Sequence, residues 1–315
     1  MNEHFKSVIL EATGASSLME REIIQELWSG YGTITRVKLV GSSHTSVVVK
    51  HIQLSTDKNH PRGWNTDIGH QRKLTSYQVE TTWYKNYSQK SRARLPNCLA
   101  IETHEDEVLI VLEDLDEAGF SLRKQSVGWK EIDICLKWLA QFHASFLGAE
   151  PDGLWEIGTY WHLATRPQEL SVLNDKSLKL AAQRIDEKLT GSAYKTFVHG
   201  DAKLANFCFS ENGRVAGVDF QYVGGGCGMK DVAYFIGSCL NEQECERLEE
   251  KILDSYFGHL HHQLGEQNND LETEWRALYR VAWADFHRFL KGWSPGHRKI
   301  NSYSERITNE VIRQL

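Results

Sequence analysis

Three polar residues have the types and the spacing that phosphoryl transfer requires. Asp201 follows His199 and Gly200, Asn206 comes five residues later, and Asp219 ends an apolar run thirteen residues beyond that. In phosphoryl transfer, an Asp orients the attacking hydroxyl and accepts its proton, while an Asn and a second Asp offer oxygen ligands to Mg²⁺. Each residue alone could simply cap a turn or a strand end. Together they predict catalysis by Asp201, with Asn206 and Asp219 as metal ligands.

Lys203 lies two residues after Asp201, a step at which protein-kinase catalytic loops also carry a lysine. From there an ammonium can reach the phosphoryl group in transfer. We therefore assign Lys203 to the catalytic group, although a solvated loop lysine fits the same sequence.

Lys50 ends the β-branched run Val47–Val49, which has the form of the strand that carries the phosphate-binding lysine of kinases. Its ammonium would neutralise the α- and β-phosphates of a nucleotide. Glu80 lies in a segment with helical character and apolar neighbours, so we expect it to pair with Lys50. Glu102 and Glu107 are the alternatives for that role.

Two glycine-containing turns could cover the phosphates with main-chain N–H groups. Gly30 and Gly32 form a Gly-x-Gly pair, while the segment 41–44 directly precedes the strand that carries Lys50. Glycine permits close approach of the backbone to a ligand. A lone Gly-x-Gly is more often a plain turn, and the sequence does not decide between the two segments.

The elements that must position these residues change character along the chain. Alternating and β-branched segments dominate the first third, and helical periodicity dominates from residue 129 onward. We predict an α+β, bilobal protein-kinase-like fold: a strand-rich N-terminal nucleotide-binding lobe (1–116) and a mostly helical C-terminal catalytic and substrate-binding lobe (117–315). The expected elements are a helix and then a helix or strand (7–27), a hairpin (33–40 with 46–52), a loop or lid (53–70), a helix (71–90), a strand (109–112), a helix with one apolar face (132–146), short strands (197–198, 207–209, 215–218), a mobile glycine-rich connector (224–228) and further helices (231–315).

Composition narrows the class of protein. The chain has 315 residues, 41% of them hydrophobic and 25% charged, with a formal net charge of −6. That balance is typical of globular proteins and lacks the basic excess of a nucleic-acid binder. The N-terminus has no apolar signal region and no run approaches the length of a membrane span. Six cysteines without a Cys-x-x-Cys pair favour reduced thiols and the cytoplasm over a zinc or disulfide framework.

The order of these motifs resembles the aminoglycoside phosphotransferase and choline kinase superfamily, in which His-Gly-Asp replaces His-Arg-Asp. Three local segments are similar to bacterial members of its ecdysteroid-kinase-like branch: 72–77, 158–163 and 292–297. The resemblance implies ATP and Mg²⁺ as cofactors and phosphorylation of a hydroxyl on a small organic molecule. It also implies that the backbone near Glu113 and Leu115 binds the adenine edge, in a solvated acidic hinge, and that His199 and Asp231 support the catalytic loop.

Aromatic residues of the second half could shape the place of the acceptor alcohol. Trp155, Tyr160 and Trp161 lie in a segment without periodicity and are candidates for a wall. A second set recurs at helical spacing and is better explained as core: Tyr279, Trp283 and Phe286. An aromatic wall suits an apolar alcohol, a ring-bearing alcohol or a quaternary ammonium.

Two acidic residues bear on the charge of the acceptor. Asp152 and Asp285 could contact a cationic substrate, but solvent exposure is the simpler expectation for both. An aminoglycoside is therefore not the first choice of substrate.

Rival functions remain open on sequence alone. A kinase-like pseudoenzyme that binds nucleotide or a partner without turnover is compatible with Gln221, which replaces the glycine of Asp-Phe-Gly, and with the undecided phosphate loop. A protein kinase is weaker, because no Ala-Pro-Glu segment follows Asp219. A metal-dependent hydrolase is weaker still, because the histidines lack His-Glu-x-x-His spacing.

Overall fold

The computed structural model describes residues 2–27, 30–53 and 67–315. The chain divides into two compact units, which are described separately here. The first, or N-terminal, unit comprises Met1–Gln89, Leu95–Leu122 and Cys208–Val218; the second, or C-terminal, unit comprises Lys90–Arg94, Arg123–Phe207 and Asp219–Leu315. The lobe boundary expected at residue 116 stays a prediction.

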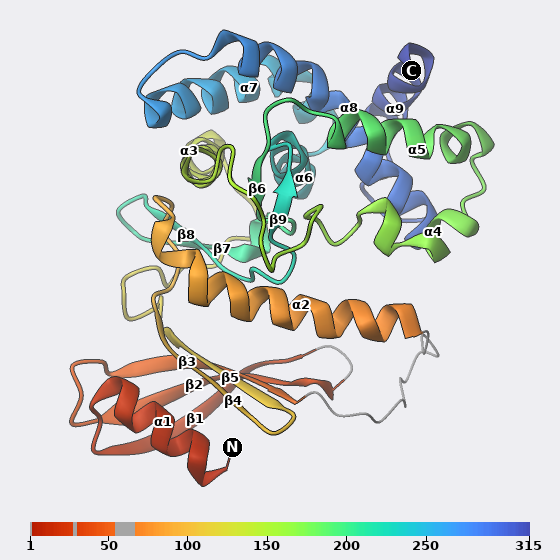
Figure 1. The fold of residues 1–315 in the computed structure, drawn as a ribbon. Helices are drawn as coiled ribbons and strands as arrows, with labels where there is room; N and C mark the ends of the chain where they lie inside the picture. Colours follow the sequence, from red (N-terminus) through yellow and green to blue (C-terminus); the bar gives the residue numbers. More distant parts are fainter. Residues whose placement is uncertain (1, 28–29, 54–66) are drawn as a thin grey trace. The chain divides into compact units, whose positions relative to one another are not determined.

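The N-terminal unit is built on one five-stranded antiparallel sheet with the order β1-β2-β3-β5-β4 (Figure 1). Its elements are α1 (Glu3–Thr13), β1 (Ser17–Glu26), β2 (Gly32–Val40), β3 (Ser46–Gln53), α2 (Asp67–Asn86), the 3₁₀ turn η2 (Ser88–Lys90), β4 (Cys98–His104) and β5 (Glu107–Glu113). The short hairpin of β7 (Phe207–Phe209) and β8 (Val215–Gly217) belongs largely to it. The predicted β2–β3 hairpin is confirmed, and β4 is a strand that periodicity did not reveal.

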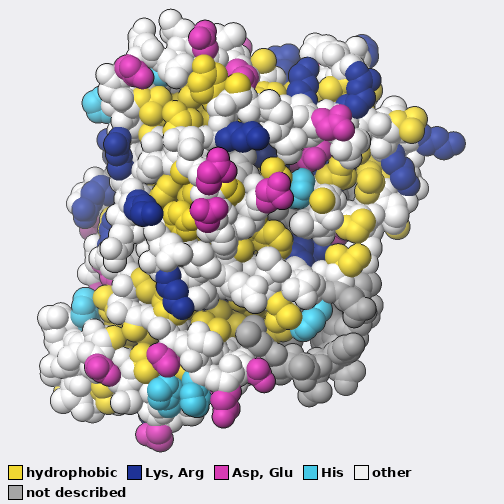
Figure 2. Space-filling view, in the orientation of Figure 1, with side chains coloured by type: hydrophobic (Ala, Val, Ile, Leu, Met, Phe, Trp, Pro, Cys, Tyr) yellow, Lys and Arg dark blue, Asp and Glu magenta, His cyan; other side chains and the backbone are white. Residues whose placement is uncertain are grey.

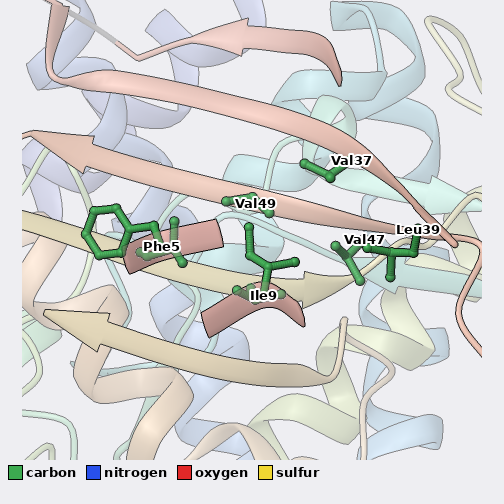
Figure 3. Close-up of a cluster of buried hydrophobic side chains, with 8 residues drawn as sticks. Phe5, Ile9, Val37, Leu39, Val47 and Val49 are labelled. Carbon is green, nitrogen blue, oxygen red and sulfur yellow. The ribbon is translucent and has the colours of Figure 1, made fainter. Parts of the chain in front are cut away.

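The two helices of this unit lie on opposite faces of the sheet (Figure 1). Phe5 and Ile9 of α1 pack on alternate residues of the strands, including Val37, Val47 and Val49 (Figure 3). Alternation along a strand sends the neighbouring residues to the other face, so Lys50 points away from α1. The sheet therefore separates a hydrophobic core from the face that carries the predicted phosphate-binding lysine.

The loop expected at 53–70 falls for the most part, at 54–66, outside the described residues. The helix expected at 71–90 is confirmed as α2, which is already helical at Asp67.

The C-terminal unit is mostly helical. Its elements are α3 (Trp129–Ser145), η3 (Leu163–Thr165), α4 (Pro167–Ser171), α5 (Lys176–Thr190), β6 (Thr196–Val198), η4 (Leu204–Asn206), β9 (Gly224–Gly226), α6 (Met229–Cys239), α7 (Glu242–Leu264), α8 (Asn269–Trp293) and α9 (Ser302–Gln314). Asn241, Asn268 and Asn301 cap the starts of α7, α8 and α9 by accepting main-chain N–H groups, as asparagine does at helix N-termini. The α+β class and the helical C-terminal half are both confirmed.

The glycine-rich run was expected to be a mobile connector, and this expectation is wrong. Gly224–Gly226 forms the buried strand β9, which pairs antiparallel with β6. A Cβ at Gly224 would lie 2.1 Å from the carbonyl oxygen of Trp155. The glycines therefore allow another stretch of backbone to approach β9 closely, which a composition rule for flexible linkers cannot foresee.

Charged side chains of both signs lie at the surface. On the face shown in Figure 2, Lys and Arg side chains are interspersed with Asp and Glu side chains. None of the helices that the structure describes is long and apolar enough to cross a membrane. All six cysteines are free thiols, and Cys135 is buried in α3.

Candidate active site

The catalytic loop begins where β6 ends, and a single buried carboxylate shapes it. Asp231, near the start of α6, accepts hydrogen bonds from the main-chain N–H groups of His199 (2.5 Å) and Gly200 (3.0 Å). Gly200 has φ +80°, and a Cβ there would lie 2.1 Å from the carbonyl oxygen of Tyr222. The His-Gly-Asp sequence is thus required by the backbone: only glycine fits this conformation and this contact.

Asp201 and Asn206 are brought together across the loop. The Asn206 side-chain amide donates to the main-chain oxygen of Asp201 (2.8 Å) and to its carboxylate Oδ2 (3.2 Å). Because its N–H groups are used in this way, its amide oxygen is left to face other groups as an acceptor. Both residues are buried, so the five-residue spacing creates one rigid pair.

Two further side chains hold the carboxylate of Asp201. The ammonium of Lys203 lies 2.8 Å from Oδ2, and the hydroxyl of Tyr234 donates to Oδ1 at 3.0 Å. The lysine was predicted from its position in the loop. Tyr234 was not, because it comes from α6 and nothing in its local sequence distinguishes it from a core tyrosine.

Burial raises the pKa of Asp201, Lys203 opposes that rise, and the neighbouring carboxylate of Asp219 adds to it. Asp219 itself adopts a left-handed backbone conformation with φ +71°. A non-glycine residue in this region is uncommon and is often found at functional sites. Two carboxylates therefore lie within electrostatic reach of each other, an arrangement that a bound cation would relieve.

These donors fit Mg²⁺. The ion prefers oxygen ligands and takes one or two from the protein, with water and substrate phosphates completing the octahedron. The amide oxygen of Asn206 and the carboxylate of Asp219 could supply two such ligands. In the part of the chain that the structure describes, no group of three or more His, Cys, Asp or Glu residues could hold a metal. A magnesium site with only two protein ligands does not need such a group.

In the N-terminal unit, the Lys50 ammonium and the Glu80 carboxylate form a buried ion pair with an N–O distance of 2.5 Å. Glu80 comes from α2 and Lys50 from β3. The two alternatives for Glu80 are engaged elsewhere, since Glu102 contacts His4 and Glu107 accepts from Gln53.

The structure separates the two candidate glycine turns. Lys50 is paired with Ile34 on β2, and Gly32 lies two residues before Ile34 on the same strand. At a rise of roughly 3.3 Å per residue, Gly32 is roughly 7 Å along the strand from that point and Gly41 roughly 23 Å. Ser42, beside Gly41, donates to the carbonyl of Thr13 at the end of α1.

The backbone at Gly32 also explains the glycine. It has φ +130°, and a Cβ there would lie 1.9 Å from the carbonyl oxygen of His51. Gly30 has φ +76° with open space around its Cβ position. The geometry therefore favours the turn with Gly30 and Gly32 as the one near Lys50.

The acidic segment after β5 differs from a solvated hinge at one residue. Glu113 is the last residue of β5, and Leu115 is buried in a second cluster of core residues. Asp114, expected in solvent, is 3% exposed. It accepts from Arg36 Nε (2.7 Å) and from Ser46 (2.6 Å), and Arg36 also pairs with Asp116. Side chains from β2 and β3 thereby hold the segment that follows β5.

A second layer behind Asp231 could not be read from the sequence. His143 of α3 places Nε2 3.2 Å from Asp231 and Nδ1 2.7 Å from the hydroxyl of Tyr256 on α7. All three side chains are buried. Their positions, 88 and 113 residues apart in the chain, offer no local pattern that would connect them.

The three aromatic residues that were expected to form a wall of the acceptor site differ in their surroundings. Tyr160 is partly buried beside Tyr234, with its hydroxyl 3.3 Å from the hydroxyl of Tyr234, and Trp155 stacks on Tyr222. Trp161 is fully buried and belongs to the core. The candidates for core among the helical aromatics, Tyr279, Trp283 and Phe286, are all buried as expected.

Asp285 was expected in solvent, and this is wrong. It is fully buried, pairs with Arg288 at 2.9 Å and accepts from the indole N–H of Trp161 at 3.0 Å. Asp152 is exposed. Because Asp285 is neutralised inside the core, it is not a recognition site for a cationic substrate.

Comparison with known proteins identifies first the fold and then the family. Three solved small-molecule kinases share the fold: an amicoumacin kinase with AMP-PNP, Ca²⁺ and amicoumacin (TM-score 0.55, 11% identity, 100% of this chain and 93% of that chain), a macrolide 2'-phosphotransferase of Brachybacterium faecium (0.54, 11%, 97% and 96%) and an aminoglycoside phosphotransferase with ADP and hygromycin B (0.52, 13%, 98% and 97%). The predicted kinase-like fold is thus confirmed.

The ecdysteroid kinase-like family model matches residues 30–150 and 159–269. The chain belongs to this family, as the local segments had indicated. No curated protein matched the sequence.

Proposed function

We propose that this protein is an ATP- and Mg²⁺-dependent phosphotransferase that phosphorylates a hydroxyl group of a small organic molecule. The observation that carries the proposal is the environment of Asp201. Its carboxylate is held by Lys203, Tyr234 and Asn206 in a loop whose backbone is anchored by Asp231. A carboxylate oriented in this way suits a group that must align a hydroxyl and take its proton.

Each residue has a distinct role in this proposal. Asp201 orients the acceptor hydroxyl and accepts its proton as the new P–O bond forms. The ammonium of Lys203 pairs with Asp201. From there its positive charge would stabilise the negative charge that develops on the phosphoryl group during transfer. Asn206 and Asp219 hold Mg²⁺, which when bound neutralises charge on the phosphate oxygens.

The nucleotide is held by the N-terminal unit. Lys50, oriented by Glu80, binds the α- and β-phosphates of ATP. The main-chain N–H groups near Gly30 and Gly32 cover the phosphates, and the backbone at Glu113 and Leu115 binds the adenine edge. The family match and the fold shared with kinases solved with ADP or AMP-PNP support nucleotide use.

The decisive experiment measures phosphate transfer from ATP to a panel of alcohols in the presence of Mg²⁺. The panel contains choline, ethanolamine, sugars, aminoglycosides, sterols and short hydroxy acids. We expect transfer by the wild type and a loss of about 10²–10⁴-fold in Asp201→Asn, the range for removing a positioned general base. Asp106→Asn makes the same change at an exposed turn and should retain full activity.

The competing function is a pseudoenzyme that binds nucleotide without turnover. A thermal shift by ATP that depends on Mg²⁺, with no transfer to the panel or to components of a metabolite extract, would establish it in place of the kinase. Activity retained in Asp201→Asn would instead remove Asp201 from the role of base.

A further inference from the structure

Lys299 places a positive charge beside Tyr234, whose hydroxyl donates to Asp201 of the predicted catalytic loop. It lies between α8 and α9, with its Nζ 4.8 Å from the ring centre of Tyr234 and 5.3 Å from that of Phe286. Its backbone is fixed from two directions. Its N–H donates to Nδ1 of His297, and its carbonyl accepts from Ser304 at the start of α9.

Tyr234 connects this lysine to the reacting groups. The Tyr234 hydroxyl donates to Asp201 Oδ1, while the Tyr234 ring faces the ammonium of Lys299. One aromatic side chain therefore separates the proposed base from a cation. A small acceptor whose hydroxyl meets Asp201 would lie within reach of both.

The ammonium of Lys299 forms no ion pair with any residue that the structure describes. Within the described ranges, no Asp or Glu lies within ion-pair distance of its Nζ, whereas two other cations of this unit have carboxylate partners. Lys203 pairs with Asp201, and Arg166 pairs with Glu169 at 3.2 Å. Burial lowers the pKa of Lys299 to about 8, as expected for an ammonium that is partly desolvated without an anion.

Lys299 also limits which groups of a substrate the neighbouring aromatic rings can bind. The faces of Tyr234 and Phe286 could bind a quaternary ammonium by cation–π contact, but the ammonium of Lys299 already occupies that position. A cationic acceptor would meet like charge there. A neutral acceptor would leave a half-buried ammonium unpaired.

We propose, building on the phosphotransferase function above, that the acceptor carries an anionic group, a carboxylate or a phosphate, which pairs with Lys299 while its hydroxyl meets Asp201. The substrate class is therefore hydroxy acids or phosphorylated alcohols. Amino alcohols and aminoglycosides are excluded by the same charge.

The test compares ligands that share a hydroxyl group and differ in the charge of a second group, by calorimetry in the absence of ATP. One set is 4-(hydroxymethyl)benzoate, its primary amide, 4-(hydroxymethyl)phenyl phosphate and the corresponding benzyltrimethylammonium alcohol; the other is glycerate, glyceramide, glycerol 3-phosphate and choline. In at least one set, we expect an anion to bind about tenfold or more tightly than the amide, the range of one charge-assisted contact. Whether the carboxylate or the phosphate binds more tightly identifies the source of the charge.

The variants assign the effect to Lys299. Lys299→Met keeps the length and apolar stem of the side chain, and the preference for the anion should disappear; Lys299→Arg should retain it. Near-ultraviolet circular dichroism checks that each variant is folded. Equal binding of anion and amide in both sets, or a preference that persists in Lys299→Met, overturns the inference.

Because binding is measured without turnover, this result is separate from the test of phosphate transfer. Anions bound through Lys299 but never phosphorylated would contradict the kinase function alone. Anions and amides phosphorylated equally well, with Lys299→Met unchanged, would contradict the inference alone.

Discussion

Glu80 and Asp231 are both buried carboxylates that position other groups, but they face different kinds of partner. Glu80 in the N-terminal unit meets the side-chain ammonium of Lys50. Asp231 in the C-terminal unit meets two main-chain N–H groups and the imidazole of His143. A lysine can turn toward another acceptor when its partner is lost, whereas a backbone N–H cannot move without its loop. Asp231 should therefore matter more for stability, and Glu80 more for nucleotide affinity.

The largest effect is expected for Asp231→Ala. The substitution leaves the buried N–H groups of His199 and Gly200 unpaired, and each such group costs about 1–3 kcal/mol. We expect the free energy of unfolding to fall by about 3–5 kcal/mol, measured by urea denaturation with the C-terminal tryptophans as probe. Asp231→Asn, which keeps one acceptor oxygen, should lie between this variant and the wild type. A loss below about 1 kcal/mol in Asp231→Ala would show that the loop is held by other contacts.

Glu80→Gln should give a smaller loss of stability together with weaker nucleotide binding. The amide can still accept a hydrogen bond from Lys50, so the expected cost in unfolding free energy stays below that of breaking a buried ion pair outright and is about 1.5–3 kcal/mol. The measurements are urea denaturation and calorimetric binding of ADP with Mg²⁺. If Glu80→Gln destabilised the protein more than Asp231→Ala, the proposed difference between side-chain and backbone anchors would be wrong.

Strand β9 allows the effect of a steric contact on stability to be compared with that of the polar contacts above. A Cβ at Gly224 would lie 2.1 Å from the carbonyl oxygen of Trp155, whereas one at Gly226 would make ordinary contacts with the side chains of Val198 (3.4 Å) and Lys230 (3.8 Å). We expect Gly224→Ala to lower the unfolding free energy by about 1–3 kcal/mol through overpacking.

Gly226→Ala is the matched control in the same strand, two residues away, and should be close to the wild type in thermal unfolding. Equal destabilisation of the two variants would mean that the strand is sensitive to any added methyl group, rather than to the approach of the segment at Trp155.

The sequence predicted those parts of the site whose spacing reflects one local element. Asp201 and Asn206 share one loop, and Lys50 directly follows the β-branched run Val47–Val49 within one strand, so their pattern can be recognised without the fold. Their assigned roles remain proposals that the experiments above address. The α+β class followed from the change in periodicity along the chain.

The parts that were missed depend on contacts between distant segments. Tyr234 and His143 look like core residues until α6 and α3 bring them to the loop. Asp114 and Asp285 were expected in solvent because an acidic residue usually is, but Arg36 and Arg288 offset the cost of burying them. No local pattern reports such a partner.

A third carboxylate, that of Asp175, is expected to contribute the least of the three to the free energy of unfolding. Asp175 is half-buried at the start of α5, where its Oδ1 accepts the N–H of Leu178 and its Oδ2 pairs with Lys291 at 2.8 Å. Burial alone would raise its pKa, but the hydrogen bonds from Lys291, Leu178 and Ser177 lower it to about 2. A lowered pKa stabilises the folded state when the carboxyl is ionised. The contribution is therefore complete above the ordinary pKa near 4 and is lost as the pH falls toward 2.

Asp175→Asn isolates the charge in this pair. Asparagine still caps α5, and Lys291 keeps its second partner, Glu305, so no group is left unpaired. We expect a loss below about 1 kcal/mol near pH 6, because solvent screens the pair. The difference from the wild type should shrink between pH 4 and pH 2 in urea denaturation. A loss as large as that of Glu80→Gln, or one independent of pH, would show that solvent screening does not make the Asp175 pair the weakest of the three.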